Sequence, residues 1–404
     1  MRPGIGRARP RRATWVVGIA AVGFVALVLA VDHSVLGASV DAARHLRWGW
    51  LLPAAALELA SLAAAAEGHR RLLLAAGGRI GLRSVLAIGF VATAIAFSVP
   101  VAPLPFSASY SVRQYVTRGI DLALAGWALV VLWMTATVSL SLVLFAGAAV
   151  SGSYLAGLAG LVSSLVFLLP PLALLLALRF PAVRAWLRAA AGGSVAMLQK
   201  RPALAGVLAT GALGTMAAGL LVVGGIWRSR PATTAGVVAA CLTGVGILVV
   251  AATGGRLAAS LRRAIQARPN PAETLDALLV RAGSIRAPRR AYAEVSALSL
   301  ANWLLDVAVL VVAIHATGAA VPWHGVLLAY GAGIVAGSLW PAPGGVGAVE
   351  AGMAAALVAA GMAAGPALAA VLVYRLVSFW MLLGIGWATM GLLTRRAQPN
   401  APTL

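Results

Sequence analysis

Four charged residues lie inside long apolar runs of this chain, where their chemistry could be ion pairing, proton transfer or anion binding. They are Glu58, Asp306, Glu350 and Arg375. A charge near the centre of a membrane helix costs at least about 2.5–3.5 kcal/mol on insertion scales. Each of these residues therefore needs a partner, a polar cavity or a function, and we take them as the first candidate site residues.

Glu350 and Arg375 are placed so that they can pair. Glu350 follows a Gly-rich break at the start of a returning half-helix, and Arg375 lies inside the final apolar run. The pair could be purely structural and pin the chain at the break. Arg375 could instead bind the phosphate of an anionic lipid headgroup, aided by backbone N–H groups at Gly344, Gly345 and Gly347. Both interpretations stay open, and they can hold together.

The other candidates are less specific. Asp306, in Asn302-Trp303-x-x-Asp306, suits a hydrogen bond between packed helices better than proton carriage. For Glu58, structural and functional interpretations are equally open. Arg113, which follows the first proline-rich break, is a further candidate ligand for a headgroup.

The overall composition shows that these charged residues lie in a strongly apolar chain. Of 404 residues, 61% are hydrophobic and 10% are charged, and the mean hydropathy is +0.95. Soluble domains are roughly 45–50% apolar and about 25% charged. The sequence therefore predicts an all-α polytopic membrane protein, and we expect no soluble catalytic domain and no enzyme activity.

Motifs for cofactors and metals are missing from the sequence. It contains no P-loop, no HExxH and no Cys/His spacing of a metal site, and its single cysteine, Cys241, lies in an apolar run. We expect no cofactor, no metal and no disulfide framework.

The net charge of +21 comes from 31 Lys+Arg against 10 Asp+Glu. These cations lie mainly in short stretches between apolar runs, where they set topology and contact anionic lipid headgroups. The expected partners are therefore membrane lipids, not nucleic acid. The predominance of Arg and Ala is typical of a GC-rich bacterial genome and favours the bacterial plasma membrane.

Eleven apolar runs follow one another along the chain, most of them near the roughly 20 residues that a spanning helix needs. The first follows five arginines and is longer than a signal-peptide core, so we interpret it as an uncleaved span. The runs are 15–31, 48–66, 84–99, 121–150, 153–178, 203–227, 234–253, 295–317, 324–340, 348–363 and 366–394.

Two joints between these runs are apolar yet incompatible with a helix. Proline removes a backbone donor and glycine frees the chain, so such a break inside a membrane must be buried in protein or line a wet cavity. The prolines of the breaks are Pro100, Pro103, Pro105, Pro341 and Pro343.

The positive-inside rule decides how the runs cross the membrane. The basic stretch 179–202 reaches the cytoplasm only if 84–120 is a re-entrant hairpin that returns to the cytoplasmic side. Arg395 and Arg396 stay in the cytoplasm only if 324–363 enters and returns on the outer side, so the two hairpins open to opposite faces. The same threading puts 254–294 in the cytoplasm. The result is about eight spans, a membrane domain over 14–394, and cytoplasmic tails at 1–13 and 395–404. Oppositely facing hairpins are typical of an inverted repeat whose halves meet near the bilayer midplane.

A family resemblance rests on the second break. The string from Pro341 to Gly352, PAPGGVGAVEAG, together with Tyr374-Arg375-Leu376, resembles the signature of the lysylphosphatidylglycerol synthase transmembrane region family, which are flippase-like integral membrane proteins. Supporting pieces are Asn302-Trp303-x-x-Asp306 and the segment 103–119, although Pro103-Leu104-Pro105 stands where many relatives have Pro followed by Gly. Full-length lysylphosphatidylglycerol synthases carry a soluble aminoacyl-transfer domain after the membrane region, and we expect that activity to be missing from this chain.

The resemblance implies a translocator of a lipid or a lipid-linked sugar. The alternative is a scaffold or accessory protein that works with the enzymes of an envelope-lipid or glycolipid pathway and needs no transport cycle. A membrane-embedded transferase is disfavoured because the sequence shows no general base or metal cluster. The oligomeric state stays open.

Overall fold

The computed structural model describes residues 46–99, 103–151, 168, 281–282, 284–339 and 343–396. All regular structure in these ranges is helical, as the composition predicts. Four of the predicted apolar runs, apart from residue 168, lie outside the described residues together with the tail 1–13 and the basic stretch 179–202. Most of 254–294 and most of the tail 395–404, whose first two residues end α16, also lie outside them. The four runs are 15–31, 153–178, 203–227 and 234–253.

The described helices differ greatly in length. Four continuous segments of 28–31 residues are long and apolar enough to cross a membrane, whereas α4, α5, α13 and α14 have only 12–17 residues. In chain order the elements are η1 (Trp48–Trp50), α3 (Leu51–Ala75), α4 (Leu82–Ser98), α5 (Pro103–Val116), α6 (Leu122–Val150), α12 (Arg289–Ala316), α13 (Val326–Leu339), η2 (Pro343–Gly345), α14 (Ala348–Ala359), α15 (Ala364–Arg375), η3 (Leu376–Met381) and α16 (Leu382–Arg396).

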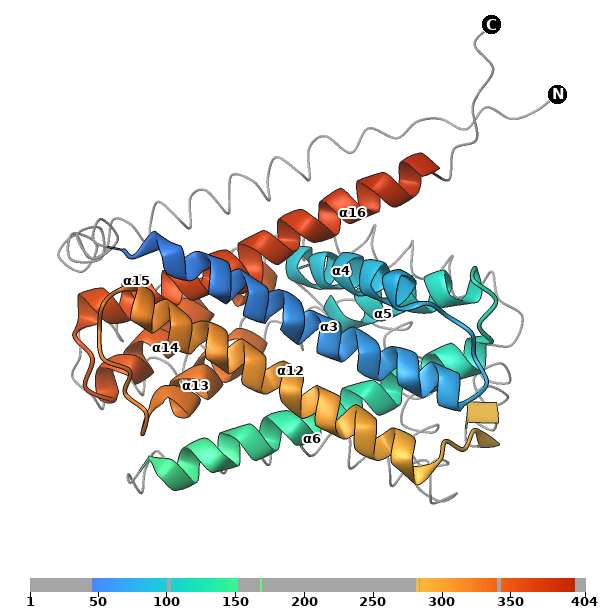
Figure 1. Ribbon diagram of the computed structural model, residues 1–404, viewed down its shortest axis with the longest axis horizontal. Coiled ribbons are helices and arrows are strands. Elements are labelled where there is room, and N and C mark those ends of the chain that lie inside the picture. The colour runs from blue at the N-terminus through green and yellow to red at the C-terminus, as the bar shows by residue number, and fades with distance from the viewer. Residues whose placement is uncertain are drawn as a thin grey trace, which may run out of the picture.

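Helices α3 and α12 form an antiparallel pair that runs through the middle of the described bundle (Figure 1). At one end, Arg47 N–H donates to Ala316 O over 2.9 Å. Near the middle, Ser61 Oγ donates to Asn302 O over 2.9 Å, and Asn302 Nδ2 donates to Ser61 O over 3.0 Å. Because polar groups in an apolar environment must be satisfied, these reciprocal bonds fix the register of the two helices.

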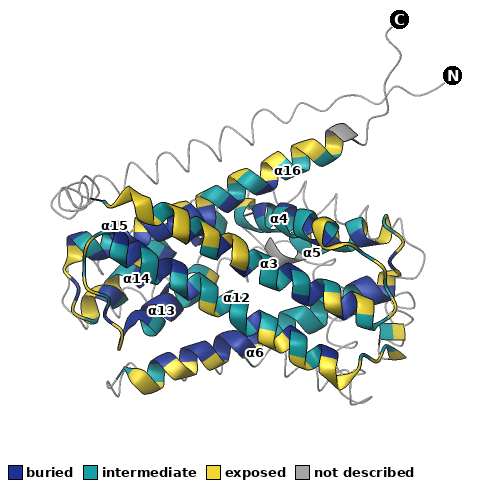
Figure 2. Ribbon diagram, in the orientation of Figure 1, coloured by how far each residue is buried: buried dark blue, intermediate teal, exposed yellow. Residues whose placement is uncertain are grey.

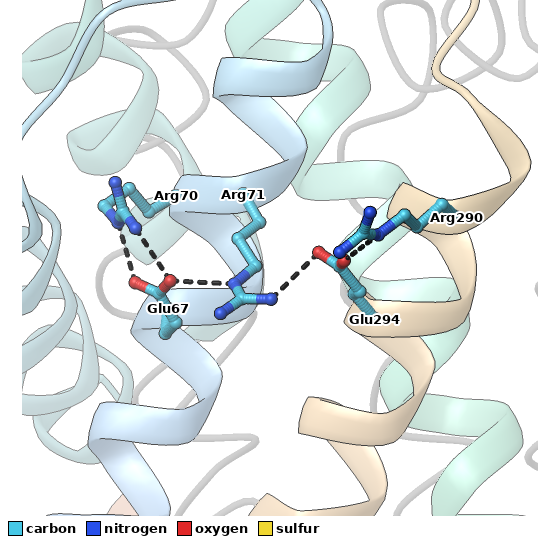
Figure 3. Close-up of polar contacts among 5 residues, drawn as sticks. All are labelled: Glu67, Arg70, Arg71, Arg290 and Glu294. Atoms are coloured by element: carbon cyan, nitrogen blue, oxygen red, sulfur yellow. Dashed lines mark hydrogen bonds and ion pairs between the residues drawn. The ribbon is translucent and has the colours of Figure 1, made fainter.

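The other end of this pair carries a network of ion pairs (Figure 3). Glu67 accepts from Arg70 and Arg71, and Arg71 reaches across to Glu294 on α12, which also accepts from Arg290. These side chains are partly exposed, so each pair stabilises the fold by little. The network lies where α3 extends past the apolar run at 48–66 to Ala75 and where α12 begins before the run at 295.

Helices α4 and α5 form the first hairpin, and both of its arms reach the same end of the bundle. At that end the loop before α4 packs closely against the loop after α5, because a Cβ on Gly78 would lie only 3.1 Å from Ile120 Cδ1. Tyr115 on α5 also contacts His69 on α3, with 3.2 Å between Tyr115 Oη and His69 Nδ1. Asp121 then caps α6, because its Oδ1 accepts from Ala123 N and Leu124 N.

Helices α13 and α14 form the second hairpin, whose arms both reach the opposite end. A Cβ on Gly325, just before α13, would overlap Ala360, just after α14. Between the arms, a Cβ on Gly337 would lie 2.6 Å from Val349 Cγ2. Small residues therefore let the two arms approach closely.

The two hairpins enter the bundle from opposite ends, and the described residues at their tips meet inside it. In Figure 1, α4 and α5 lie to the right, whereas α13 and α14 lie to the left. Phe97, at the tip of the first hairpin, packs against Phe379, which lies against Gly344 at the tip of the second. The described residues therefore form two helical hairpins whose tips approach each other from opposite ends of the bundle.

Burial follows the pattern of a protein that faces lipid. Figure 2 shows exposed residues along α6, α12 and α16. Several residues of these helices are large, apolar and exposed, among them Leu142, Phe145, Leu304 and Trp387. Such a surface is unfavourable in water and suits acyl chains.

Candidate functional site

Arg375 and Glu350 form an ion pair where the hairpin tips meet. Arg375 Nε donates to Glu350 Oε1 over 2.6 Å, and the two side chains are only 8% and 16% exposed. Arg375 Nη2 also donates to Gly344 O over 2.8 Å, and Glu350 Oε2 accepts from Gly347 N–H over 2.6 Å. The sequence suggested this pair, and the structure forms it with two further bonds to the glycine turn.

The glycine turn between η2 and α14 depends on backbone conformations that only glycine adopts readily. Gly344, Gly345 and Gly347 have φ angles of 60°, 66° and 90°. A Cβ on Gly344 would overlap the Phe379 ring, and a Cβ on Gly345 would lie 2.8 Å from Gly337 Cα. The turn therefore brings its backbone within reach of Arg375 because it lacks side chains.

Phe379 completes the surroundings of the arginine. Arg375 Cζ lies 4.3 Å from the centroid of the Phe379 ring, a cation–π contact. Phe379 is part of the π-helix Leu376–Met381, which interrupts the last span directly after Arg375. Widened turns of this kind recur at functional sites, and here the turn directs the ring at both Arg375 and Phe97.

A second polar layer lies beside the ion pair. Asp306 Oδ2 accepts from Tyr330 Oη over 2.7 Å, and Oδ1 accepts from Tyr374 Oη over 3.0 Å. Glu58 on α3, only 4% exposed as a residue, is a neighbour of Asp306. The two tyrosine bonds of Asp306 tie α12 to α13 and α15.

The structure does not bring every candidate residue to this place. Arg113 lies on an exposed part of α5, and its guanidinium makes no recorded hydrogen bond or ion pair with another described residue. Of the break prolines, Pro103 opens α5, Pro105 follows in its first turn and Pro343 opens η2, whereas Pro100 and Pro341 lie outside the described residues.

Three aromatic residues of the site were not among the candidates. Phe379 stands four positions after Arg375, on the same helix face, so helical spacing could have suggested it. Tyr374 is part of the string that carried the family resemblance, although no role was assigned to it. Tyr330 carries no local signal, because only the folded second hairpin brings it to Asp306.

Arg375 keeps hydrogen-bond donors beyond those that bind Glu350 and Gly344. In the ranges that the structure describes, no group of three or more His, Cys, Asp or Glu residues could hold a metal ion. A guanidinium offers five N–H donors, and the recorded bonds of Arg375 use two of them. The remaining donors could bind the oxygens of a phosphate.

Comparison with known proteins shows the family of the chain. The chain matches the family described as lysylphosphatidylglycerol synthase TM region over residues 183–386, just over half of its length. The chain belongs to this family. The match includes α12, the whole second hairpin and Arg375, so the ion pair and the Asp306 layer lie within the family region, apart from Glu58 on α3. No curated protein matches the chain.

Membership in the lysylphosphatidylglycerol synthase TM region family, together with the apolar helices, identifies a multi-pass membrane protein. Four helices in the described part of the chain can cross a membrane by length and composition.

Proposed function

We propose that this protein is a translocator that moves a polar, anionic headgroup of a lipid or lipid-linked sugar across the bacterial plasma membrane. The observation that carries the proposal is the meeting of two hairpins from opposite ends of the bundle at one buried arginine. Non-helical backbone at membrane depth is tolerated where it lines a polar path, and inverted repeats commonly build their substrate sites in this way.

In this proposal the two hairpins are re-entrant, and both termini are cytoplasmic. A headgroup passes between the hairpin tips while its acyl chains stay in lipid. Arg375 supplies the positive charge for the phosphate, and Glu350 releases the guanidinium when the anion arrives. Charge-assisted bonds from guanidinium to phosphate are strong and can be bidentate, so the anion can compete with the carboxylate.

Translocation by the purified protein tests this function. The protein is reconstituted into liposomes that contain fluorescent phosphatidylglycerol, and dithionite is added to reduce the fluorophores of the outer leaflet. We expect wild-type protein to bring inner-leaflet lipid out, so that the signal falls below that of empty liposomes. Arg290→Gln, which removes a mostly exposed arginine from α12, is the matched control and should behave like wild type.

The scaffold alternative predicts a different outcome. The pairing of Arg375 with Glu350 favours it, because a buried arginine that is fully paired can serve packing alone. The scaffold is supported, and translocation is contradicted, if a folded protein moves neither fluorescent phosphatidylglycerol nor a fluorescent lipid-linked sugar out of the inner leaflet.

A further inference from the structure

The carboxyl groups of Glu58 and Asp306 form an acidic pair that the headgroup site does not use. Glu58 lies on α3 and Asp306 on α12, and the two carboxyl groups are neighbours in the interior of the helix pair. The Ser61–Asn302 bonds, about one helical turn away, fix the register that brings them together. The contact is therefore a consequence of how the two helices pack.

The groups that face this pair from neighbouring helices are hydrogen-bond donors. Tyr330 on α13 and Tyr374 on α15 both donate to Asp306. Arg375 is the cation whose charge acts on Asp306, but it already pairs with Glu350. Glu58 Oε2 has no hydrogen-bond partner among the described residues. The described surroundings thus offer the acidic pair no cation of its own.

Two neighbouring buried carboxyl groups without a cation of their own favour a bound proton. Two carboxylates only accept hydrogen bonds, and two negative charges in contact within a low-dielectric interior repel each other. Both oxygens of Asp306 accept from tyrosines, as a carboxylate does, whereas Glu58 Oε2 is buried and has no partner among the described residues. The geometry therefore puts the proton on Glu58.

We propose that Glu58 and Asp306 form a proton-binding site that couples lipid translocation to a proton gradient. This inference rests on the translocator function proposed above. Through Tyr330, Asp306 holds α13, the first arm of the second hairpin, and through Tyr374 it holds the residue next to Arg375. Loss of the bound proton leaves two like charges between α3 and α12, and this repulsion displaces the hairpin arm that shares Asp306.

Infrared spectroscopy of the detergent-purified protein tests the proton site without any transport. At neutral pH we expect wild-type protein to show the carbonyl stretch of a protonated carboxylic acid. This band should disappear in Glu58→Gln, which keeps the shape of the side chain, and stay in Arg290→Gln. If Glu58→Gln does not fold, the band is assigned in the wild-type protein instead, by its shift in heavy water and its loss at high pH. A wild-type protein without the band overturns the proton site.

Translocation in liposomes with an imposed pH gradient tests the coupling. We expect the wild-type and Arg290→Gln rates to change when the gradient is imposed or reversed, and the rates of Glu58→Gln and Asp306→Asn to lose this dependence. A wild-type rate that ignores the gradient overturns the coupling and leaves lipid translocation intact. A wild-type protein that moves no lipid overturns translocation and with it the coupling, while the infrared band still decides whether the proton is bound.

Discussion

At the residue scale, the burial of Arg375 with Glu350 predicts how the protein responds to the loss of either charge. Removing one partner strands the other in low dielectric, which typically costs roughly 3–5 kcal/mol, whereas removing both is much milder. We expect Arg375→Gln and Glu350→Gln each to lower the melting temperature strongly, and the double variant to lie closer to wild type. Thermal melting in detergent measures this, with Arg290→Gln as control. Additive losses in the double variant would show that the two charges do not stabilise each other.

The sequence identifies these charged residues, but it does not identify the aromatic residues that surround them. A charge inside an apolar run must have a reason, so Glu58, Asp306, Glu350 and Arg375 stand out without any structure. Their neighbours do not, because an aromatic residue in an apolar run is unremarkable. Tyr330 and Phe379 acquire their roles only through contacts with distant segments.

At the element scale, the glycine turn of the second hairpin predicts a difference between two substitutions. Gly344 and Gly77 both have positive φ angles, and a left-handed residue other than glycine costs roughly 1–2 kcal/mol. A Cβ on Gly77 meets nothing within 4 Å, whereas one on Gly344 would overlap Phe379. We therefore expect Gly77→Ala to lower the stability of the fold by the backbone cost alone, and Gly344→Ala to lower it clearly more.

Thermal melting of both glycine variants checks this expectation. Gly89→Ala, in the middle of α4 with open space around its Cβ position, controls for the added methyl group. Equal losses in Gly344→Ala and Gly77→Ala would mean that Phe379 yields easily, and that the tip of the hairpin is not rigidly packed.

The elements themselves were largely predictable. Apart from α5, the described helices correspond to seven of the predicted runs. Helix α5 begins at Pro103, inside the stretch where the prolines were expected to exclude a helix, because proline is tolerated in the first turn. The ends were less predictable, because α3 continues through Glu67, Arg70 and Arg71 to Ala75. The apolar run ends at residue 66 because charged residues follow it, whereas the helix continues and its charged side chains form ion pairs with one another and with Glu294 on α12.

At the scale of the whole molecule, the charge pattern predicted that the hairpins come from opposite ends, and this arrangement can be tested in cells. In a Cys241→Ser background, a cysteine at Ser284 lies at the end of the first hairpin and one at Ala363 at the end of the second. We expect an impermeant thiol reagent to label Ala363→Cys in intact cells and Ser284→Cys only after permeabilisation. Labelling of both from outside would contradict the proposed orientation. What the sequence could not predict is that the two breaks touch at Phe97 and Phe379, because this depends on how distant helices pack.

The central claim is that the positive charge of Arg375 moves a headgroup and does not only pin the second hairpin. The most direct measurement is translocation of fluorescent phosphatidylglycerol by the Glu350→Gln/Arg375→Gln double variant in liposomes, beside wild type and Arg290→Gln at matched protein content. Because the double variant leaves neither charge stranded, we expect it to fold, to melt near wild type, and to lose translocation. A double variant that folds and translocates at the wild-type rate would contradict the headgroup site.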